Sequence, residues 1–405
     1  MGSVNQVYTK ILNHFGISQK RNFICVLAVF TLFSCIFTFV PTFLNLEIHH
    51  LHLFSQDLMS LDFAMPYVGC FFGTLVFPFL VRKFSIKRIL IVSFFLLGVE
   101  YALIIVLLKS DYNIVLRFFF GLIYITIFLV LFMYQGKIFT SSYQSRLFLF
   151  AGLLSGVAYA FGSFLNDVIS QNFSVWGTAF FLIISCLLIS FKIEDDKEEK
   201  KPEDSHLKKD SSGEKSYREL IKESPWVFLI VFMGYVTFYG FSTYYPLFGE
   251  KLGLTEGKAA SFLATAQFCG LFLMPVGGYL GDKFGYEKST SFIIIVSLGM
   301  IGASFFTQNE TLISVFFSVA EGGMLSFYTL TTAWVVSLYS HHNLAKSLSL
   351  LNFIGQGGAM LSPFGMGALL RFYGSDGFIS WFFIGMSLVL MLLLGRRFFR
   401  KKTDS

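Results

Sequence analysis

Long apolar segments joined by short polar turns fill most of the chain, and one strongly polar segment, residues 193–224, divides them into two groups. A helix needs roughly 20 mainly apolar residues to cross the hydrocarbon core of a bilayer. The sequence holds twelve such segments, at 22–44, 58–81, 87–108, 112–134, 146–169, 173–191, 225–248, 258–281, 288–307, 311–338, 344–370 and 377–395. The pattern therefore predicts an all-α membrane protein with twelve transmembrane helices, six on each side of the polar segment.

The two apolar groups resemble each other in sequence. Residues 37–43, FTFVPTF, and residues 242–248, STYYPLF, end corresponding segments with threonine, proline and the last phenylalanine at the same spacing. Each group then reaches a basic turn, LVRKFSIKR at 80–88 and LGDKFGYEK at 280–288. Two similar bundles can rock about a site held between them, which is typical of transporters. The predicted divisions are an N-terminal six-helix bundle at 1–192, a charged cytoplasmic linker at 193–224, and a C-terminal six-helix bundle with a basic tail at 225–405.

Composition and charge agree with a membrane protein. Hydrophobic residues make up 55% of the chain and charged residues 14%, with a mean hydropathy of +0.66, which leaves too little charge to cover a soluble protein of this length. The net charge of +6 does not indicate a nucleic-acid partner, because the basic residues gather in alternate turns and in the tail. By the positive-inside rule these turns and both termini are cytoplasmic. The expected location is the inner or plasma membrane of the cell.

The linker is rich in charge and poor in apolar residues before Tyr217. Such a segment cannot bury enough surface to fold and is expected to be a solvated tether. Tyr217, Leu220 and Ile221 could form one amphipathic turn on the inner membrane surface. A regulatory docking site is the alternative.

The turn after the eighth predicted span carries the most specific motif. Residues 277–285 read GGYLGDKFG, which resembles the loop signature G-x-L-a-D-r-f-G of the major facilitator superfamily of secondary transporters. With two halves of six spans and a long charged loop between them, the resemblance covers essentially the whole chain and implies the fold of that family. The first-half copy departs from the signature, because Arg82 stands at the aspartate position and Ser85 at that of the last glycine.

The motif residues also have a physical reading. Gly278 and Gly281 let two helix backbones approach closely. Asp282 can accept hydrogen bonds from a neighbouring helix N-terminus, where negative charge is favoured. Gly285 suits the reversal of the chain, and Lys283 holds the turn in the cytoplasm. The resemblance implies that this turn latches the inward-closed state.

Two shorter motifs point to coupling and direction. Arg117 and Gly121 in the fourth span resemble the family's intramembrane arginine motif R-x-x-x-G, which is linked to proton coupling. Residues 152–157, GLLSGV, partly resemble the glycine-proline motif associated with exporters. Val157 stands at the proline position, which weakens the case for export.

Ionisable residues inside a membrane cost ~2.5–3.5 kcal/mol or more unless they are paired or wet. Glu100 and Arg117 are expected at similar depth in adjacent spans, where they could form an ion pair, either static or broken when Glu100 takes a proton. Glu321 in the tenth span has no obvious basic partner, so it is a candidate proton carrier, a contact for a substrate amine, or a buried neutral acid. Asp62 and Asp167 lie near the outer ends of their spans, where we expect hydrated carboxylates or, alternatively, an entry gate.

Aromatic and polar residues in the second half are candidates for a cavity wall. Tyr235 and Tyr239 lie one helical turn apart, and mid-span tyrosine hydroxyls need partners. A wall for an apolar or cationic molecule and an ordinary core are both open. The candidate cavity residues are Tyr235, Tyr239, Tyr328, Trp334, Gln267, Asn352 and Gln356, although helix–helix hydrogen bonds are the commoner use of the last three.

The sequence shows no phosphate-binding loop, no nucleophile–base–acid set and no HExxH pattern, so we predict neither an enzyme nor a bound cofactor or metal. The leading hypothesis is a monomeric secondary active transporter that works by alternating access. We expect it to be coupled to protons or another ion, with efflux of small amphipathic compounds as the first choice. Uptake of a metabolite such as a sugar, an amino acid or an organic anion is the alternative, and a non-transporting receptor or scaffold is the alternative of another class.

Overall fold

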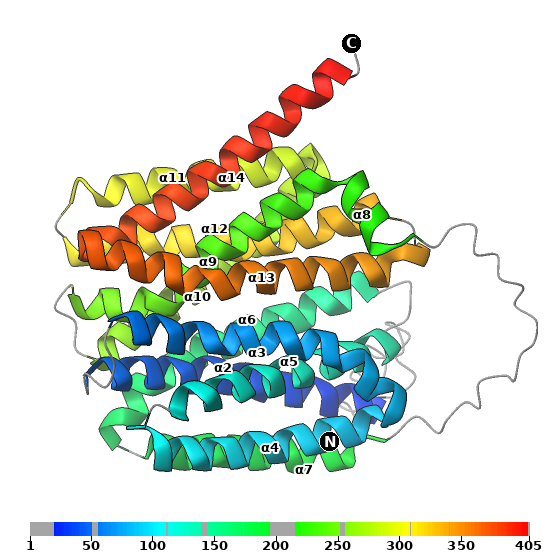
Figure 1. Ribbon diagram of the computed structural model, residues 1–405, viewed down its shortest axis with the longest axis vertical. Coiled ribbons are helices and arrows are strands. Elements are labelled where there is room, and N and C mark those ends of the chain that lie inside the picture. Colours follow the sequence, from blue (N-terminus) through cyan, green and yellow to red (C-terminus); the bar gives the residue numbers. More distant parts are fainter. Residues whose placement is uncertain are drawn as a thin grey trace, which may run out of the picture.

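The protein is almost entirely helical (Figure 1), as seen in a computed structural model that describes residues 20–50, 56–110, 112–138, 144–172, 174–194, 215–251, 256–307, 309–339 and 341–403. The helices of the first half are α2 (Lys20–His50), α3 (Gln56–Lys83), α4 (Ile86–Leu107), α5 (Tyr112–Ile138), α6 (Gln144–Asn172) and α7 (Val175–Lys192). A short helix, α8 (Tyr217–Glu223), lies at the end of the linker. The helices of the second half are α9 (Pro225–Lys251), α10 (Glu256–Phe284), α11 (Tyr286–Ser304), α12 (Glu310–Leu338), α13 (His341–Tyr373) and α14 (Ser375–Thr403).

Each predicted span coincides with one of the long helices, and the ends agree to within four residues except that α2 and α14 run on beyond the predicted ends at 44 and 395 to His50 and Thr403. Nine of these helices are long and apolar enough to cross a membrane over their described residues, whereas α6, α11 and α13 fall short. The number of twelve crossings therefore stays a prediction. Helix α2 runs on past the predicted end of the first span, with Pro41 inside it, which is possible because neighbouring groups in a membrane bundle can satisfy the backbone that a proline leaves unbonded.

The two halves pack their helices in corresponding pairs, as the duplicated sequence predicts. In the first half α2 contacts α6 and α7, α3 contacts α5, and α4 contacts α5 and α7. In the second half α9 contacts α13 and α14, α10 contacts α12, and α11 contacts α12 and α14. The halves meet where α3 packs on α13 and where α6 packs on α10. Replacing each helix by its counterpart in the other half turns the first of these contacts into the second. The bundles are therefore pseudo-symmetric.

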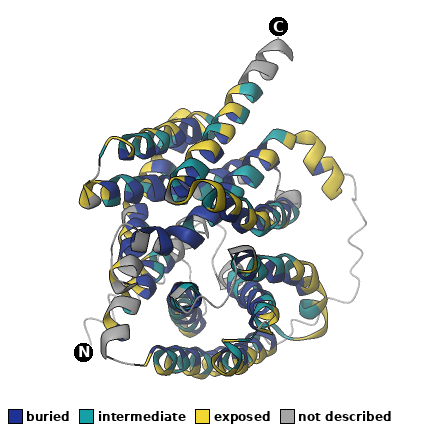
Figure 2. Cartoon of the chain, turned by 60° about the vertical axis from the view of Figure 1, so that its left-hand side comes forward, coloured by how far each residue is buried: buried dark blue, intermediate teal, exposed yellow. Residues whose placement is uncertain are grey.

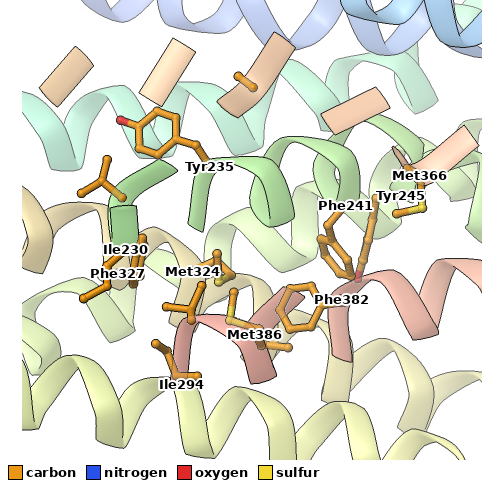
Figure 3. Close-up of a cluster of buried hydrophobic side chains, with 14 of the residues drawn as sticks. Ile230, Tyr235, Phe241, Tyr245, Ile294, Met324, Phe327, Met366, Phe382 and Met386 are labelled. Atoms are coloured by element: carbon orange, nitrogen blue, oxygen red, sulfur yellow. The ribbon is translucent and has the colours of Figure 1, made fainter. Parts of the chain in front are cut away.

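Each half has its own apolar core. One cluster of buried side chains draws on α2 to α7, and a second draws mainly on α9 to α14. Figure 3 shows part of the second cluster, where Phe241 and Phe382 lie near Met386. Many large hydrophobic residues are exposed, among them Phe79 at 70%, and Figure 2 shows exposed positions in yellow along the outer helices. In a membrane protein such an apolar exterior contacts lipid.

Helices α3 and α5 pack backbone against backbone at two glycines. A Cβ atom added to Gly121 would collide with the carbonyl oxygen of Pro66, and one added to Gly69 would collide with that of Phe118. We expect Gly121→Ala to destabilise the protein by ~1–3 kcal/mol, because α3 and α5 must then move apart. The midpoint of thermal unfolding in detergent measures this effect.

The matched control for that prediction is Gly299→Ala. A Cβ atom at Gly299 in α11 has open space around it, so this variant removes a helical glycine without a collision, and alanine favours a helix over glycine. Equal unfolding midpoints for the two variants would show that the α3–α5 contact is looser than described.

Both ends of the linker are fixed to helix ends on one side of the bundle, which we call the linker side; the opposite side is the far side (Figure 1). At the end of α7, the Asn22 side chain donates to the carbonyl oxygen of Glu194 at 3.2 Å and accepts from its amide at 2.9 Å. Arg21 adds an exposed ion pair to Glu194 at 3.3 Å. Residues 195–214, on which the prediction of a solvated tether mainly rests, lie outside the described residues.

Helix α8 forms at the position of the predicted amphipathic turn, whose place on the membrane surface stays a prediction. Its N-terminus has a capping box between Ser216 and Glu219, and the hydrogen bonds from the Ser216 backbone and hydroxyl lower the pKa of the Glu219 carboxyl. Leu220 is buried, and its carbonyl oxygen accepts a hydrogen bond from the Tyr339 hydroxyl at 2.9 Å. Tyr217 and Ile221 are exposed. Helix α8 is thus attached to the second half at the end of α12.

Candidate functional site

A buried polar cluster lies where α2, α3 and α5 meet. The Arg117 guanidinium donates from Nε to Asp62 Oδ2 at 3.0 Å, and its Nη2 lies 3.0 Å from the same oxygen. Arg117 Nη2 also donates to Asn45 Oδ1 at 2.6 Å, and Asn113 Nδ2 donates to Asp62 Oδ1 at 3.3 Å. All four side chains are buried, with Asp62 at 0% and Arg117 at 2% exposure. Asp62 is thus held by a charged donor and an amide donor.

The ion pair predicted between Glu100 and Arg117 is wrong, and so is the prediction that Asp62 is hydrated. Asp62 is the ion-pair partner of Arg117 because α3, rather than α4, presents a carboxylate to this face of α5. Glu100 is 3% exposed, and neither of its carboxyl oxygens has a hydrogen-bond partner among the described residues. The Arg117 charge lies within electrostatic range of Glu100. The side chain of Asp167 lies outside the described residues.

Glu321 lies in the second half, on α12. It is fully buried, and Ser242 Oγ on α9 donates to its Oε1 at 2.9 Å. Its Oε2 has no hydrogen-bond partner within the described part of the chain. The next residue, Gly322, packs closely against the backbone of Gly270 on α10.

Three of the predicted cavity residues come together. The ring centroids of Tyr235 and Tyr239 are 5.5 Å apart, and those of Tyr235 and Tyr328 are 5.9 Å apart. The Tyr239 ring also meets Tyr67 of the first half at 4.9 Å, edge to face. Tyr235, Tyr239 and Tyr328 therefore lie at the contact between the two halves and belong to an aromatic layer that we call the tyrosine layer.

The first half supplies members of the tyrosine layer that the sequence analysis missed. Tyr67 is one, and Tyr124 and Tyr159, whose hydroxyls are hydrogen-bonded to each other, are two more. Phe37 stacks on Tyr124 with ring centroids 4.0 Å apart. The available signal was the internal repeat, because a mid-span tyrosine in one half suggests an aromatic counterpart in the other. The tyrosine layer, made of Tyr67, Tyr124, Tyr159, Tyr235, Tyr239 and Tyr328, carries no formal charge.

Hydrogen bonds join the halves around this layer and toward the far side. The hydroxyls of Tyr67 and Thr243 share a hydrogen bond of 2.9 Å. Those of Ser60 and Tyr244 share one of 3.1 Å near the far-side ends of α3 and α9. Ser163 Oγ donates to Oε1 of the predicted residue Gln267 at 3.2 Å, so Gln267 has a partner in the other half.

The remaining predicted cavity residues lie apart from one another. Trp334 is buried on the linker side, where the Arg396 guanidinium carbon lies 4.4 Å from its ring centroid and Arg396 Nη1 pairs with Glu287 at 2.8 Å. It therefore helps to hold α14 against α11 and α12. Gln356 is 8% exposed, and its Oε1 has no partner among the residues described. Asn352 is half-buried on the same helix, α13.

The glycines of the loop motif lie in different surroundings. Gly285 has a φ of +85°, a conformation that favours glycine. Gly278 faces open space, so it does not bring two helices together, whereas a Cβ on Gly281 would meet the Leu330 and Tyr286 side chains. The side chain of Asp282 lies outside the described residues, and its expected hydrogen bonds with it.

The turn at 280–288 and its first-half copy at 80–88 differ in their side-chain contacts. Lys283 is exposed, with its Nζ 3.4 Å from the Tyr279 hydroxyl. In the first half, Ser85 has a φ of −67° and its side chain caps α4 by accepting from the Arg88 amide at 3.4 Å. The two turns therefore start the next helix by different means, which explains how serine replaces glycine there.

Comparisons with known proteins agree with this architecture. A family model of the Major Facilitator Superfamily matches residues 23–320 and 259–405, and no curated protein sequence matches the chain. Nucleoside transporter NupG superposes with a TM-score of 0.68 at 11% identity over 92% of this chain and 97% of that chain. A mutant of NupG superposes with a TM-score of 0.71 at 9% identity over 93% of this chain and 98% of that chain.

A bacterial homologue of the human lysosomal transporter Spinster, in an inward-facing and unoccupied conformation, gives a TM-score of 0.69 at 12% identity over 93% of this chain and 95% of that chain. Identities this low show the fold alone. The family match spans nearly the whole described chain and agrees with the predicted resemblance, the multi-pass membrane architecture and the expectation that the protein is not an enzyme. The chain belongs to the Major Facilitator Superfamily of transporters.

Proposed function

We propose that the protein is a secondary active transporter of a small molecule that works by alternating access. The halves 1–192 and 225–405 would move as units about the tyrosine layer, with 193–224 as the linker between them. The observation that carries this proposal is that Tyr67 of one half meets Tyr239 of the other in the middle of a pseudo-symmetric pair of bundles. Such a contact between repeats is where substrate sites lie in this class of fold.

We propose protons as the coupling ion. Glu321 and Glu100 are buried carboxyl groups with oxygens that lack partners among the described residues, and Arg117 supplies a buried positive charge close to Glu100. Groups of this kind in membrane helices mark proton or ion pathways. Another ion remains the alternative, to be distinguished by exchanging the gradient.

The tyrosine layer favours small amphipathic compounds, since its rings offer apolar faces and its hydroxyls offer hydrogen bonds without charge. We propose efflux of such compounds as the first function. Uptake of a metabolite is the second candidate, because the protein of similar fold, NupG, is a nucleoside transporter. We expect a monomer in the inner or plasma membrane, and the distribution of lysine and arginine favours cytoplasmic termini.

Purified protein in proteoliposomes tests this function. A library of neutral, cationic and anionic solutes is offered with an inside-acid, an inside-alkaline and no pH gradient, and with sodium or potassium gradients in parallel. We expect at least one solute to accumulate under a pH gradient and to lose that accumulation when an ionophore removes the gradient. A receptor or scaffold would move no solute under any gradient, and that outcome would exclude transport.

A further inference from the structure

We propose that helix α8 is a docking site for an anionic phospholipid on the linker side of the membrane. Arg218 and Lys222 contact the phosphate of the lipid headgroup, and Tyr217 and Ile221 lie against the adjoining acyl chains. The sequence analysis expected an amphipathic turn here and assigned no role to either basic residue. The proposal goes beyond transport, because it concerns what covers α8 whatever solute the protein moves.

The position of α8 in the chain places it at the level of the headgroups. Helix α8 ends at Glu223, and the stretch of α9 that is long and apolar enough to cross a membrane begins at Pro225. Only Ser224 separates them, and one residue spans at most about 3.6 Å. Leu229, one helical turn into α9, is 42% exposed, so lipid contacts this part of α9. Figure 1 shows α8 turned out of the line of α9, as expected of a helix that stays at the membrane boundary.

Two hydrogen bonds hold α8 and its start against the second half. Leu220 is buried, and its carbonyl oxygen accepts from the Tyr339 hydroxyl at 2.9 Å. The Tyr339 ring in turn stacks on Phe228 of α9, with ring centroids 6.5 Å apart. Just before the helix, the carbonyl oxygen of Lys215 accepts from Lys346 Nζ on α13 at 3.4 Å. Because Leu220 faces the protein, the directions of the other α8 side chains about the helix axis are fixed.

Two strips of different chemistry face away from the protein. Tyr217 and Ile221 are 51% and 39% exposed, and their i, i+4 spacing puts them on one face of the helix. Arg218 and Lys222 have the same spacing one residue further on and are also exposed, so they lie together beside the apolar pair. An apolar strip next to a basic one is typical of helices that lie in the interface of an anionic membrane.

The free charge on α8 is positive. Both acidic side chains of the helix have partners close by, because Glu219 belongs to the capping box and Glu223 pairs with Lys215. Arg218 and Lys222, in contrast, form no hydrogen bond or ion pair with any described residue, although Lys222 lies within electrostatic range of Glu219. The surface is therefore complementary to an anion, and arginine matches the geometry of a phosphate group particularly well.

The acidic part of the linker, EDDKEE at 194–199, is the rival partner. It could satisfy the two positive charges, but it offers no apolar group to cover Tyr217 and Ile221. A phospholipid supplies both a phosphate and acyl chains, and it is present wherever α9 enters the membrane. The pairing of a basic strip with an apolar strip therefore favours the lipid.

Fluorescence quenching in lipid nanodiscs tests the proposal. The five cysteines of the chain are replaced by alanine, and Tyr217→Cys carries a bimane, which is an apolar fluorophore. The discs contain phosphatidylcholine with a rising fraction of brominated phosphatidylglycerol or, in parallel, of brominated phosphatidylcholine. Two basic residues at an anionic surface strengthen binding by ~30-fold together, so quenching by the brominated phosphatidylglycerol should reach its midpoint at a correspondingly lower fraction. Arg218→Gln with Lys222→Gln should remove this difference between the lipids.

Lys83→Gln with Arg88→Gln is the matched control, because it removes two exposed basic side chains from the turn between α3 and α4 on the same side. It should keep the preference for the anionic lipid. Equal midpoints in the parent, a preference that survives in Arg218→Gln with Lys222→Gln, or one that is lost in the control would each overturn the proposal.

Two further results would assign the surface to another partner and so also overturn it. A preference that appears only after the acidic residues of 194–199 are neutralised would assign α8 to the linker. Displacement of the brominated lipid by soluble glycerol phosphate would reduce the partner to a free phosphate. If the labelled chain does not fold, native mass spectrometry of the unlabelled chain decides, since the double variant at Arg218 and Lys222 should bind phosphatidylglycerol ~30-fold more weakly while its binding of phosphatidylcholine is unchanged. Unchanged binding of phosphatidylglycerol there would overturn the proposal.

Discussion

Replacing Arg117 with glutamine should destabilise the protein by ~3–5 kcal/mol, because it leaves Asp62 as a charge buried without its counterion. Asp62 is fully buried and receives both of its charge-assisted contacts from this one guanidinium at 3.0 Å. Asn113 would remain as its only described donor, at 3.3 Å. The free energy of unfolding in mixed micelles measures the loss, and the midpoint of thermal unfolding should fall with it.

The double variant Arg117→Gln with Asp62→Asn separates a lost charge pair from lost packing. Removing both charges leaves two amides that can bond to each other, so stability should largely return. Arg21→Gln serves as the matched arginine control, because its ion pair with Glu194 is exposed at 64% and 70% and such pairs contribute ~0–1 kcal/mol. A double variant as unstable as Arg117→Gln alone would show that the guanidinium acts through packing rather than charge.

The fold could be predicted from the sequence because membrane spans follow from length and hydropathy. The repeat between 37–43 and 242–248 indicated two related bundles, and the observed helix pairs correspond across the halves. The helix ends were less predictable. Pro41 was placed near the end of a span, yet α2 continues to His50, since a proline inside a packed membrane helix does not force it to end.

The partners of the buried charges could not be predicted from the same pattern. Counting residues along each span gives depth, and it placed Glu100 and Arg117 at a similar level in the membrane. Depth does not say which face of a helix a residue occupies or which helices are neighbours. Arg117 pairs with Asp62 because α3 packs against α5, although α4 lies between these helices in sequence. Tyr235 and Tyr239 were predictable as a pair because an i, i+4 spacing places both on one helix face. The contact of Trp334 with Arg396 was not predictable, because it depends on how α14 packs against α12.

Glu321→Gln is expected to abolish accumulation of substrate driven by a pH gradient. A gradient of one pH unit is worth about 1.4 kcal/mol per proton, which supports about tenfold accumulation by a transporter that couples one proton to one solute. The glutamine side chain keeps the size of glutamate and can still accept the hydrogen bond that Ser242 donates at 2.9 Å. It cannot gain or lose a proton. The variant should therefore bring the solute found in the library screen only to equal concentrations on both sides, while it still exchanges that solute across the membrane.

Glu287→Gln provides the matched glutamate for this measurement. Glu287 pairs with Arg396 on the linker side, at 19% exposure, and lies away from the tyrosine layer. Its neutralisation should leave tenfold accumulation per pH unit in place, with at most a small loss of stability. Accumulation that survives in Glu321→Gln would exclude Glu321 as the proton carrier. Accumulation lost in Glu321→Gln but retained in Glu100→Gln would place the coupling proton in the second half, because Glu321 lies on α12 and Glu100 lies on α4.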